Sequence, residues 1–243
     1  INLNVIHVSN QMAQLVEETE TNLPTIKYGD KDYVMYRSPD YNNGAAKPPF
    51  HDDKKLMTVI IDQLEKVDCF VETGSYMGKT IYFAGKNYPN VKCYSCELQQ
   101  DFFNIANAQV KDLPNVNLSM VPSPDAVYNI QKKFDPEVFD KKCLFWLDAH
   151  WKTDPLYAEL LYITKNYKHF TIIIDDFTIP GDSGEGKFWS DGYDVDKIKK
   201  FIVKKDQFKY YMPNYSSSDE CCKKNAVGYI IITNMDNFET FDN

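Results

Sequence analysis

The stretch that decides the fold is residues 68–97, which read DCFVETGSYMGKTIYFAGKNYPNVKCYSCE. It contains an apolar strand that ends in Glu72, a glycine-containing turn, a helix, and a second strand that ends in Glu97. This order is typical of a βαβ unit that binds a nucleoside at the carboxyl ends of its strands. One acid at a strand end is uninformative, because such positions often carry solvated acids. Two acids on consecutive strands around a glycine turn favour a cofactor site.

The spacing of the glycines favours a ligand without phosphate groups. A dinucleotide site requires G-x-G-x-x-G so that the backbone can approach a pyrophosphate, and Tyr76 stands where the second glycine would be. In a P-loop, four residues separate the first glycine from the G-K-[ST] run. Here only three residues separate Gly74 from Gly78. The near match at Lys79 and Thr80 keeps a nucleotide-binding protein as an alternative. S-adenosylmethionine fits better, since it carries a ribose, an ammonium and a sulfonium but no phosphate.

The acids and the turn supply the predicted cofactor contacts. Glu97 is expected to accept hydrogen bonds from both ribose hydroxyls, and Glu72 to face the ammonium group or an amide of the turn. Asp148, at the end of a later strand, is also expected to contact the cofactor. The turn residues expected at the cofactor are Gly74, Ser75, Tyr76 and Gly78.

The composition predicts one large domain or a domain with a short appendage. The chain has 243 residues, of which 43% are apolar and 14% aromatic, which is enough for a substantial core. The net charge of −8 argues against a nucleic-acid partner, because proteins that bind nucleic acids usually present a basic face. The lysines of residues 197–205 are interpreted as the solvated face of an amphipathic helix. Since there is no long apolar run and no signal peptide, we expect no membrane segment and a cytoplasmic location.

The six cysteines indicate reduced thiols rather than a cross-linked or zinc-bound framework. Three of them lie in predicted buried strands, where cysteine acts as a small apolar side chain. Cys93 and Cys96 have the spacing of half a zinc site, but they lie in a strand. Side chains at that spacing in a strand point to opposite faces, which argues against a shared metal.

Hydrophobic periodicity predicts a helical and loop-rich start followed by regular strand–helix alternation. Residues 1–20 carry an apolar stripe with helical spacing, and the prolines of residues 38–51 predict a loop long enough to be a substrate lid. Asp52 is expected to cap a helix that runs to Lys66. The strands are expected at 69–73, 91–96, 116–121, 143–148, 170–175, 207–212 and 226–233, and the helices between them at 78–87, 99–111, 124–133, 155–167 and 193–204.

This alternation predicts an α/β fold with helices on both faces of the sheet. We divide the chain into an N-terminal extension with a lid-like loop, residues 1–55, and a main domain, residues 56–243. Ligands of such sheets bind outside the carboxyl ends of the strands, so each candidate site residue should lie at such an end.

Carboxylates follow two of the predicted strands. Asp148 ends strand 143–148, and Asp175 and Asp176 follow strand 170–175. One helical crossover joins the two strands, so we expect them to be neighbours about 4.8 Å apart. Like charges this close repel unless a cation offsets them, and Mg²⁺ prefers oxygen ligands. The alternative is that Asp148 caps a turn and Asp175 faces solvent.

These parts suit methyl transfer from a sulfonium to a hydroxyl. Such an in-line displacement depends on the alignment of the nucleophile with the methyl group. A divalent cation lowers the pKa of a bound hydroxyl, and a vicinal diol chelates such an ion. Asp148 or His150 is then the expected base.

With its nucleoside-binding motif and its group of carboxylates, the stretch of residues 55–235 resembles the class I S-adenosylmethionine-dependent methyltransferases. The first motif is VETGSYMG (71–78), and the fourth-strand motif is LFWLDAHW (144–151). D-A-H followed by Ile-Asp-Asp (174–176) is similar to the macrocin-type sugar O-methyltransferases that modify antibiotic deoxysugars. That resemblance implies a Rossmann-like, seven-stranded, mostly parallel sheet with an antiparallel last strand. It also implies a Mg²⁺ site at Asp148, Asp175 and Asp176, with His150 or Asp148 as base.

The sequence departs from that family after the third strand, where residues 121–125 read VPSPD in place of a glycine and an acid. Ser123 is the candidate adenine contact there. The Asn-, Lys- and Tyr-rich composition and the start at Ile1 fit a methyltransferase domain of a larger, viral, glycan-building protein. Such a domain would be fused to glycosyltransferase domains and would be located in the host cytoplasm. Its expected acceptor is a deoxyhexose such as rhamnose within a glycan.

Three other functions remain open at this point. The same acids permit a catechol or another small phenol as acceptor. The Gly78-Lys79-Thr80 run permits a P-loop-like nucleotide binder. A non-catalytic module that recognises glycans through its tyrosines would keep the fold without affinity for S-adenosylmethionine.

Overall fold

The computed structural model describes residues 25–35, 49–50, 53–149, 155–179, 193–215 and 228–235. The predicted helix at residues 1–20 and most of the predicted loop at residues 38–51 lie outside these ranges.

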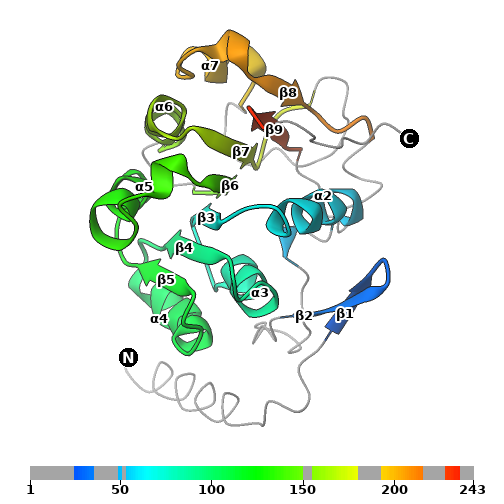
Figure 1. The fold of residues 1–243 in the computed structure, drawn as a ribbon, viewed down its shortest axis with the longest axis vertical. Helices are drawn as coiled ribbons and strands as arrows, with labels where there is room; N and C mark the ends of the chain where they lie inside the picture. The colour runs from blue at the N-terminus through cyan, green and yellow to red at the C-terminus, as the bar shows by residue number, and fades with distance from the viewer. Residues whose placement is uncertain are drawn as a thin grey trace, which may run out of the picture.

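Seven strands form one sheet in the order β5-β4-β3-β6-β7-β9-β8 (Figure 1). The first five strands of this order are parallel, and β9 is antiparallel to both of its neighbours. The sequence prediction of a seven-stranded, mostly parallel sheet with an antiparallel last strand is therefore confirmed. The strands are β3 (Cys69–Thr73), β4 (Lys92–Cys96), β5 (Val116–Ser119), β6 (Lys142–Leu147), β7 (His169–Ile174), β8 (Lys209–Tyr211) and β9 (Ile230–Thr233).

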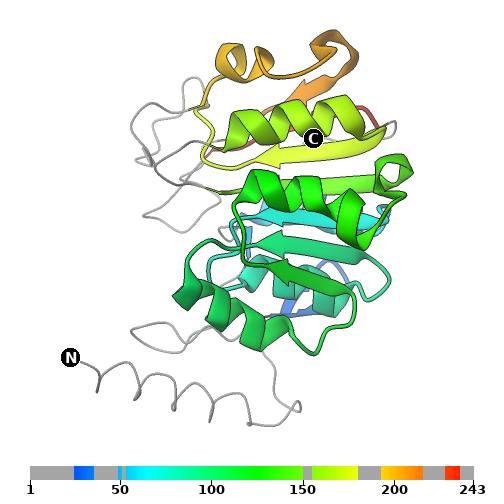
Figure 2. The ribbon, with the colours of Figure 1, turned by 90° about the vertical axis from the view of Figure 1, so that its left-hand side faces the viewer.

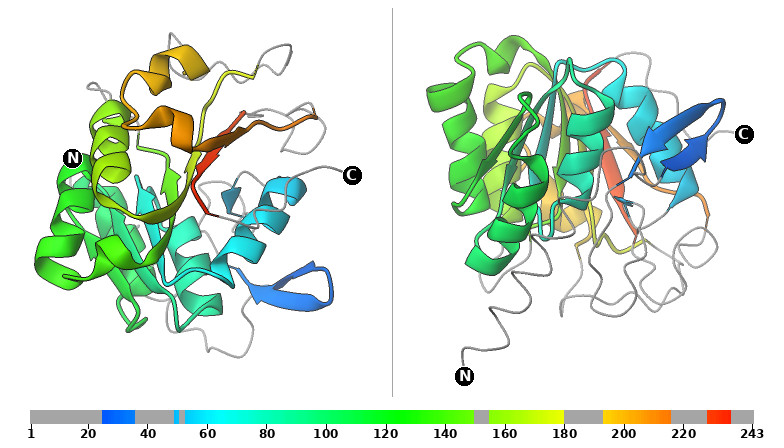
Figure 3. Two further views of the ribbon diagram at one scale, coloured as in Figure 1. Left: turned by 45° about the horizontal axis from the view of Figure 1, so that its top comes forward. Right: turned by 90° about the horizontal axis from the view of Figure 1, so that it is seen from below.

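Helices cover both faces of the sheet (Figures 2 and 3). One apolar core holds residues of α2 (Lys54–Leu64), α3 (Lys79–Asn87) and α4 (Gln100–Val110), and the other holds residues of α5 (Ser123–Asn129), α6 (Leu156–Asn166) and α7 (Val195–Lys199). The strands read as continuous apolar runs because both faces are buried, as in β7, HFTIII, where all residues after His169 are buried. Within the described ranges, no helix has the length and hydropathy that crossing a membrane requires.

The predicted helix starts and ends needed three corrections. Asp53, not Asp52, caps α2, because its side chain accepts the Leu56 amide. The helix expected at 124–133 ends at Asn129 and continues as a π-helix, Ile130–Phe134. The helix expected at 193–204 is shorter than predicted and corresponds to α7, Val195–Lys199. It ends early because the last amides bond three residues back, and the Val203 amide donates to Thr164 Oγ1 of α6.

A hairpin that the sequence analysis missed precedes the main sheet. Its strands are β1 (Thr25–Tyr28) and β2 (Lys31–Val34), joined at Gly29 and Asp30. A two-residue Gly-Asp connection between alternating apolar residues is a hairpin signal that was present in the sequence. Val34 exchanges two 2.8 Å hydrogen bonds with the Asn87 side chain, so the hairpin is fixed to the end of α3.

Candidate active site

The candidate site lies where the strand order reverses. β3 pairs with β4 on one side and with β6 on the other, so the chain turns back across β3 at this point. Open α/β sheets bind ligands at the carboxyl ends of the strands beside such a reversal. Glu72 is the next-to-last residue of β3, and Glu97 and Asp148 directly follow β4 and β6.

Strand alternation directs the acids to one face of the sheet. Side chains two residues apart in a strand share a face. Phe70, Trp146 and Ile173 all belong to the core packed by α2 and α3. Glu72, Asp148 and Asp175 each follow one of these residues by two positions, so they continue the same face at the carboxyl edge.

The glycine turn is held against the end of β4. The Ser75 amide donates to Cys96 O at 2.8 Å, and the Gly78 amide donates back to Ser75 O at 2.7 Å. Tyr76, at the top of the turn, has φ of +48°, the left-handed region that non-glycine residues seldom adopt. Its ring packs on Phe102 with the centroids 4.3 Å apart. The turn is therefore held by a backbone hydrogen bond to the end of β4, by a second one within the turn, and by an aromatic contact.

Glu97 binds this turn directly. Its Oε2 accepts the Tyr76 amide at 2.8 Å, and its Oε1 accepts the amides of Leu98 and Gln99, both at 2.8 Å. Glu72 is predicted to face the ammonium group or an amide of the turn, and in the structure the Tyr76 amide is bonded to Glu97. A carboxylate that accepts three amides has a fixed orientation and still has lone pairs available for a ligand.

Glu72 is a buried acid that favours its protonated form. Its side chain is 2% exposed and accepts a 2.6 Å hydrogen bond from Ser95 Oγ. Burial raises the pKa of Glu72 to about 8, and the nearby charges of Asp148 and Glu97 add to the rise. Around neutral pH this side chain is therefore mostly neutral.

Asp148, Asp175 and Asp176 come together as predicted. One carboxylate oxygen from each lies within 4.8 Å of the others. Asp175 is 2% exposed and its amide donates to Leu147 O at 3.1 Å, while Asp176 has φ of +54°. Trp146 Nε1 donates to Asp148 Oδ2 over 3.4 Å. Three converging carboxylates are a donor set that suits a hard divalent cation.

Gly74 joins the turn to the aspartate group. It has φ of +81°, and a Cβ added there would lie 2.8 Å from Asp148 O and 3.0 Å from Ala149 Cα. Only glycine therefore allows the turn and the end of β6 to pack so closely. Gly78 has a similar role further on, since its Cβ would lie 2.9 Å from Ala106 of α4.

Thr73, Leu98 and Met120 at this edge were not found from the sequence, whereas Ser75 was predicted there. Thr73 Oγ1 and Ser75 Oγ are buried without a hydrogen-bond partner among the described residues, which is unusual unless a ligand completes them. Leu98 and Met120 are 48% and 44% exposed. Leu98 follows Glu97 directly, and Met120 follows Ser119, whose carbonyl accepts the Glu97 amide. Apolar side chains directly after two adjacent strands were the available signal.

The roles of two predicted residues stay predictions. Ser123 is buried as the first residue of α5. His150 lies outside the described residues.

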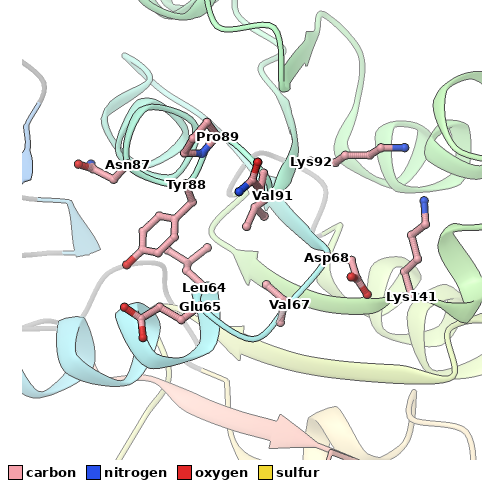
Figure 4. A pocket seen from close by; sticks show the side chains of 11 residues that line it. Leu64, Glu65, Val67, Asp68, Asn87, Tyr88, Pro89, Val91, Lys92 and Lys141 are labelled. Carbon is pink, nitrogen blue, oxygen red and sulfur yellow. The ribbon is translucent and has the colours of Figure 1, made fainter.

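A cavity of about 510 Å³ lies at the opposite edge of the sheet (Figure 4). Its walls include Val67 and Asp68, directly before β3, and Lys92, the first residue of β4. It therefore opens at the amino ends of the strands, away from the predicted site residues.

Comparisons with solved structures identify the fold. An O-methyltransferase from Bacillus cereus in complex with SAH is 14% identical, covers 76% of this chain and 83% of its own, and has a TM-score of 0.55. A candidate O-methyltransferase from Klebsiella pneumoniae has 13% identity, the same coverages and a TM-score of 0.53. Cofactor-bound Rv0187 from MTB has 13% identity, coverages of 94% and 88%, and a TM-score of 0.51.

The chain has the Rossmann-like fold of the class I methyltransferases. No family model matches the sequence, and a search of curated proteins gives no match.

Proposed function

We propose that this protein is an S-adenosylmethionine-dependent O-methyltransferase that acts on a sugar hydroxyl with the help of a divalent cation. The observation that carries the proposal is the contact at Gly74. It places the amide-bound Glu97 and the three aspartates on two sides of one turn. Such a site offers one carboxylate to a nucleoside and three to a cation.

The residues present fit the proposed methyl donor. Glu97 would accept the ribose hydroxyls through its remaining lone pairs, while Leu98 and Met120 offer apolar contact to a purine. The hydroxyls of Thr73 and Ser75, which have no hydrogen-bond partner in the part of the chain that the structure describes, would bind the polar end of the methionine moiety. An edge with several acids also favours a cation over a neutral ligand of the same shape.

The aspartates fit a magnesium ion, which would be held by Asp148, Asp175 and Asp176. When bound there, a divalent cation makes a coordinated hydroxyl more acidic. Because Asp148 is partly exposed and follows β6 at the turn, its carboxylate would accept the proton that the acceptor loses. His150 is the second candidate for that role.

A sugar acceptor, with a deoxyhexose such as rhamnose in a glycan as the first choice, rests on the resemblance of the D-A-H and Ile-Asp-Asp runs to macrocin-type enzymes. A catechol or another small phenol is the second candidate, because three aspartates around a cation suit a vicinal diol of either kind. Some proteins of the same fold are described as O-methyltransferases, which supports transfer to oxygen in both cases.

The test is methyl transfer from radiolabelled S-adenosylmethionine to two panels, deoxysugar glycans and catechols, with Mg²⁺ and with excess EDTA. We expect product with the deoxysugars and loss of turnover in EDTA. Full turnover in EDTA would remove the cation from the proposal, and product with catechols alone would change the acceptor.

Two further experiments separate the remaining alternatives. Lys79→Ala should leave methyl transfer nearly unchanged, whereas a P-loop-like protein would lose its function. A glycan-binding module without catalysis would bind sugar but show no heat of binding with S-adenosylhomocysteine.

A further inference from the structure

A hydrogen-bonded chain of three side chains lies next to the proposed cation site. Tyr215 OH donates to Asp53 Oδ2 at 2.7 Å. The hydroxyls of Tyr215 and Tyr229 are 2.5 Å apart. Because Tyr215 has one hydroxyl proton and gives it to Asp53, Tyr229 must be the donor to Tyr215. We name Asp53, Tyr215 and Tyr229 the tyrosine clamp.

The clamp joins three segments that are far apart in the sequence. Asp53 begins α2, where its other oxygen accepts the Leu56 amide at 2.9 Å. Tyr215 follows β8, and Tyr229 directly precedes β9. Asp53 and Tyr229 are each 2% exposed. Polar groups this deeply buried are costly to leave without a partner, so the three side chains hold one another in place.

Tyr229 lies opposite two of the proposed cation ligands. Ile174 of β7 pairs with Ile230 of β9, and the Phe177 amide donates to Gly228 O at 2.8 Å. Between these two points, Asp175 and Asp176 follow β7, whereas only Tyr229 precedes β9. Two residues against one is the arrangement of a β-bulge, which redirects side chains and is common beside active sites.

The backbone at this bulge is tightly packed. Asp176 has φ of +54°, which is consistent with an extra residue in the strand. A Cβ on Gly228 would lie 2.3 Å from Phe177 O, so the two strands touch there. The direction of the Asp175 and Asp176 carboxylates therefore depends on where the start of β9 is held.

We infer that the tyrosine clamp positions the cation ligands. By anchoring the Tyr229 side chain, it fixes the start of β9 and with it the bulge that brings Asp175 and Asp176 towards Asp148. Its three members are positioning residues, since none of them is a cation ligand. This inference rests on the cation site of the proposed function.

The experiment measures Mn²⁺ binding to the full chain by calorimetry, together with S-adenosylhomocysteine binding and thermal melting. Tyr215→Phe keeps the ring, which lies under Lys55 Nζ at 4.4 Å, and removes the shared hydroxyl. Since partners that directly orient ligands typically change metal affinity by about 10–100-fold, we expect this more distant change to weaken Mn²⁺ binding roughly threefold to tenfold. Affinity for S-adenosylhomocysteine should stay within about twofold, because neither Glu97 nor the glycine turn takes part in the hydrogen bonds of the clamp.

Two comparisons make the result specific. Tyr229→Phe should also weaken Mn²⁺ binding, because it removes the bond between the two hydroxyls that Tyr215→Phe removes. The double variant should be no worse than Tyr215→Phe, which already loses both that bond and the bond to Asp53. Tyr210→Phe is the matched control, since it also removes one tyrosine hydrogen bond, the one that Tyr210 OH donates to Lys205 O at 3.1 Å near β8. It should leave Mn²⁺ binding unchanged.

Each contrary result has a distinct meaning. Tyr215→Phe with wild-type affinity for Mn²⁺ would overturn the inference and leave the proposed function intact. A parallel loss of affinity for S-adenosylhomocysteine and of melting temperature would show general loosening and would also overturn it. A wild-type protein that binds no Mn²⁺ would refute the cation site itself, and the inference with it.

Discussion

The Cα of Gly74 lies so close to the main chain of Asp148 that a methyl group on it would stand 2.8 Å from the Asp148 carbonyl oxygen. Gly74 belongs to the turn that Glu97 holds, and Asp148 belongs to the aspartate group, so this contact sets the distance between the two halves of the site. A nucleoside and a cation bound to these halves would be neighbours.

Gly74→Ala should therefore damage the site beyond its cost in stability. Gly29→Ala is the matched control, because Gly29 also has positive φ, +58°, but no atom lies within 4 Å of its added Cβ. Each change imposes left-handed strain of about 1 kcal/mol on alanine, but only Gly74→Ala forces the turn away from Asp148. We expect calorimetry to show weaker binding of both S-adenosylhomocysteine and Mn²⁺ in Gly74→Ala alone. Equal ligand affinities in the two variants would contradict the role of this contact.

Glu97→Gln should weaken cofactor binding. The glutamine side chain must turn its NH₂ group towards main-chain amides that now donate to the carboxylate. An unmade buried hydrogen bond costs about 1–3 kcal/mol, so we expect S-adenosylhomocysteine affinity to fall roughly 10- to 100-fold in calorimetry. Glu137→Gln, on an exposed glutamate, is the control. Wild-type affinity in Glu97→Gln would mean that Glu97 only ends its strand.

Asp175→Asn should remove most Mn²⁺ affinity and spare the cofactor. The substitution keeps the size of the side chain but replaces a buried carboxylate of the three-aspartate group by a neutral amide. We expect Mn²⁺ binding to weaken by about tenfold or more, on the scale of a change in a metal's immediate surroundings. Asp196→Asn, exposed on α7, should match the wild type. Unchanged Mn²⁺ binding in Asp175→Asn would exclude this aspartate as a ligand.

Glu72 should make stability fall as the pH rises. Folding raises the pKa of this acid from 4.5 to about 8, so the folded protein keeps a proton that the unfolded chain loses. The stabilisation is fully present below about pH 4.5 and is lost as the pH approaches about 8. Glu72→Gln does not titrate, so the melting temperature of the wild type should decline relative to this variant between these values and then run parallel to it. Melting curves that stay parallel throughout would show that folding does not raise the pKa of Glu72.

The sequence predicted the alternation of strands and helices and the meeting of Asp148 with Asp175, because both follow from local periodicity and from one helical crossover. It did not predict that Glu97, rather than Glu72, binds the turn. That choice depends on the direction of the Tyr76 amide, which the left-handed backbone at Tyr76 sets and no residue pattern records.

Long-range contacts were also invisible in the sequence. Asp53 and Tyr215 are 162 positions apart and meet only because β9 enters the sheet between β7 and β8. The bulge at Asp175 and Asp176 likewise depends on the register of β9, since a strand read alone does not show how many residues its partner places opposite. By contrast, the hairpin at residues 25–34 has a local signal in the sequence, the Gly-Asp pair that joins its strands.

The place of β9 in the sheet also orders events during synthesis. Both strands that flank it, β7 and β8, leave the ribosome first and must wait for residues 228–235 before they can pair with it. The nascent chain can thus form the glycine turn and its hydrogen bond to Glu97 early. The aspartate pair after β7 takes its final conformation only once the last strand has been synthesised. A chain released before residue 228 would carry a nucleoside-binding half without a finished partner beside it.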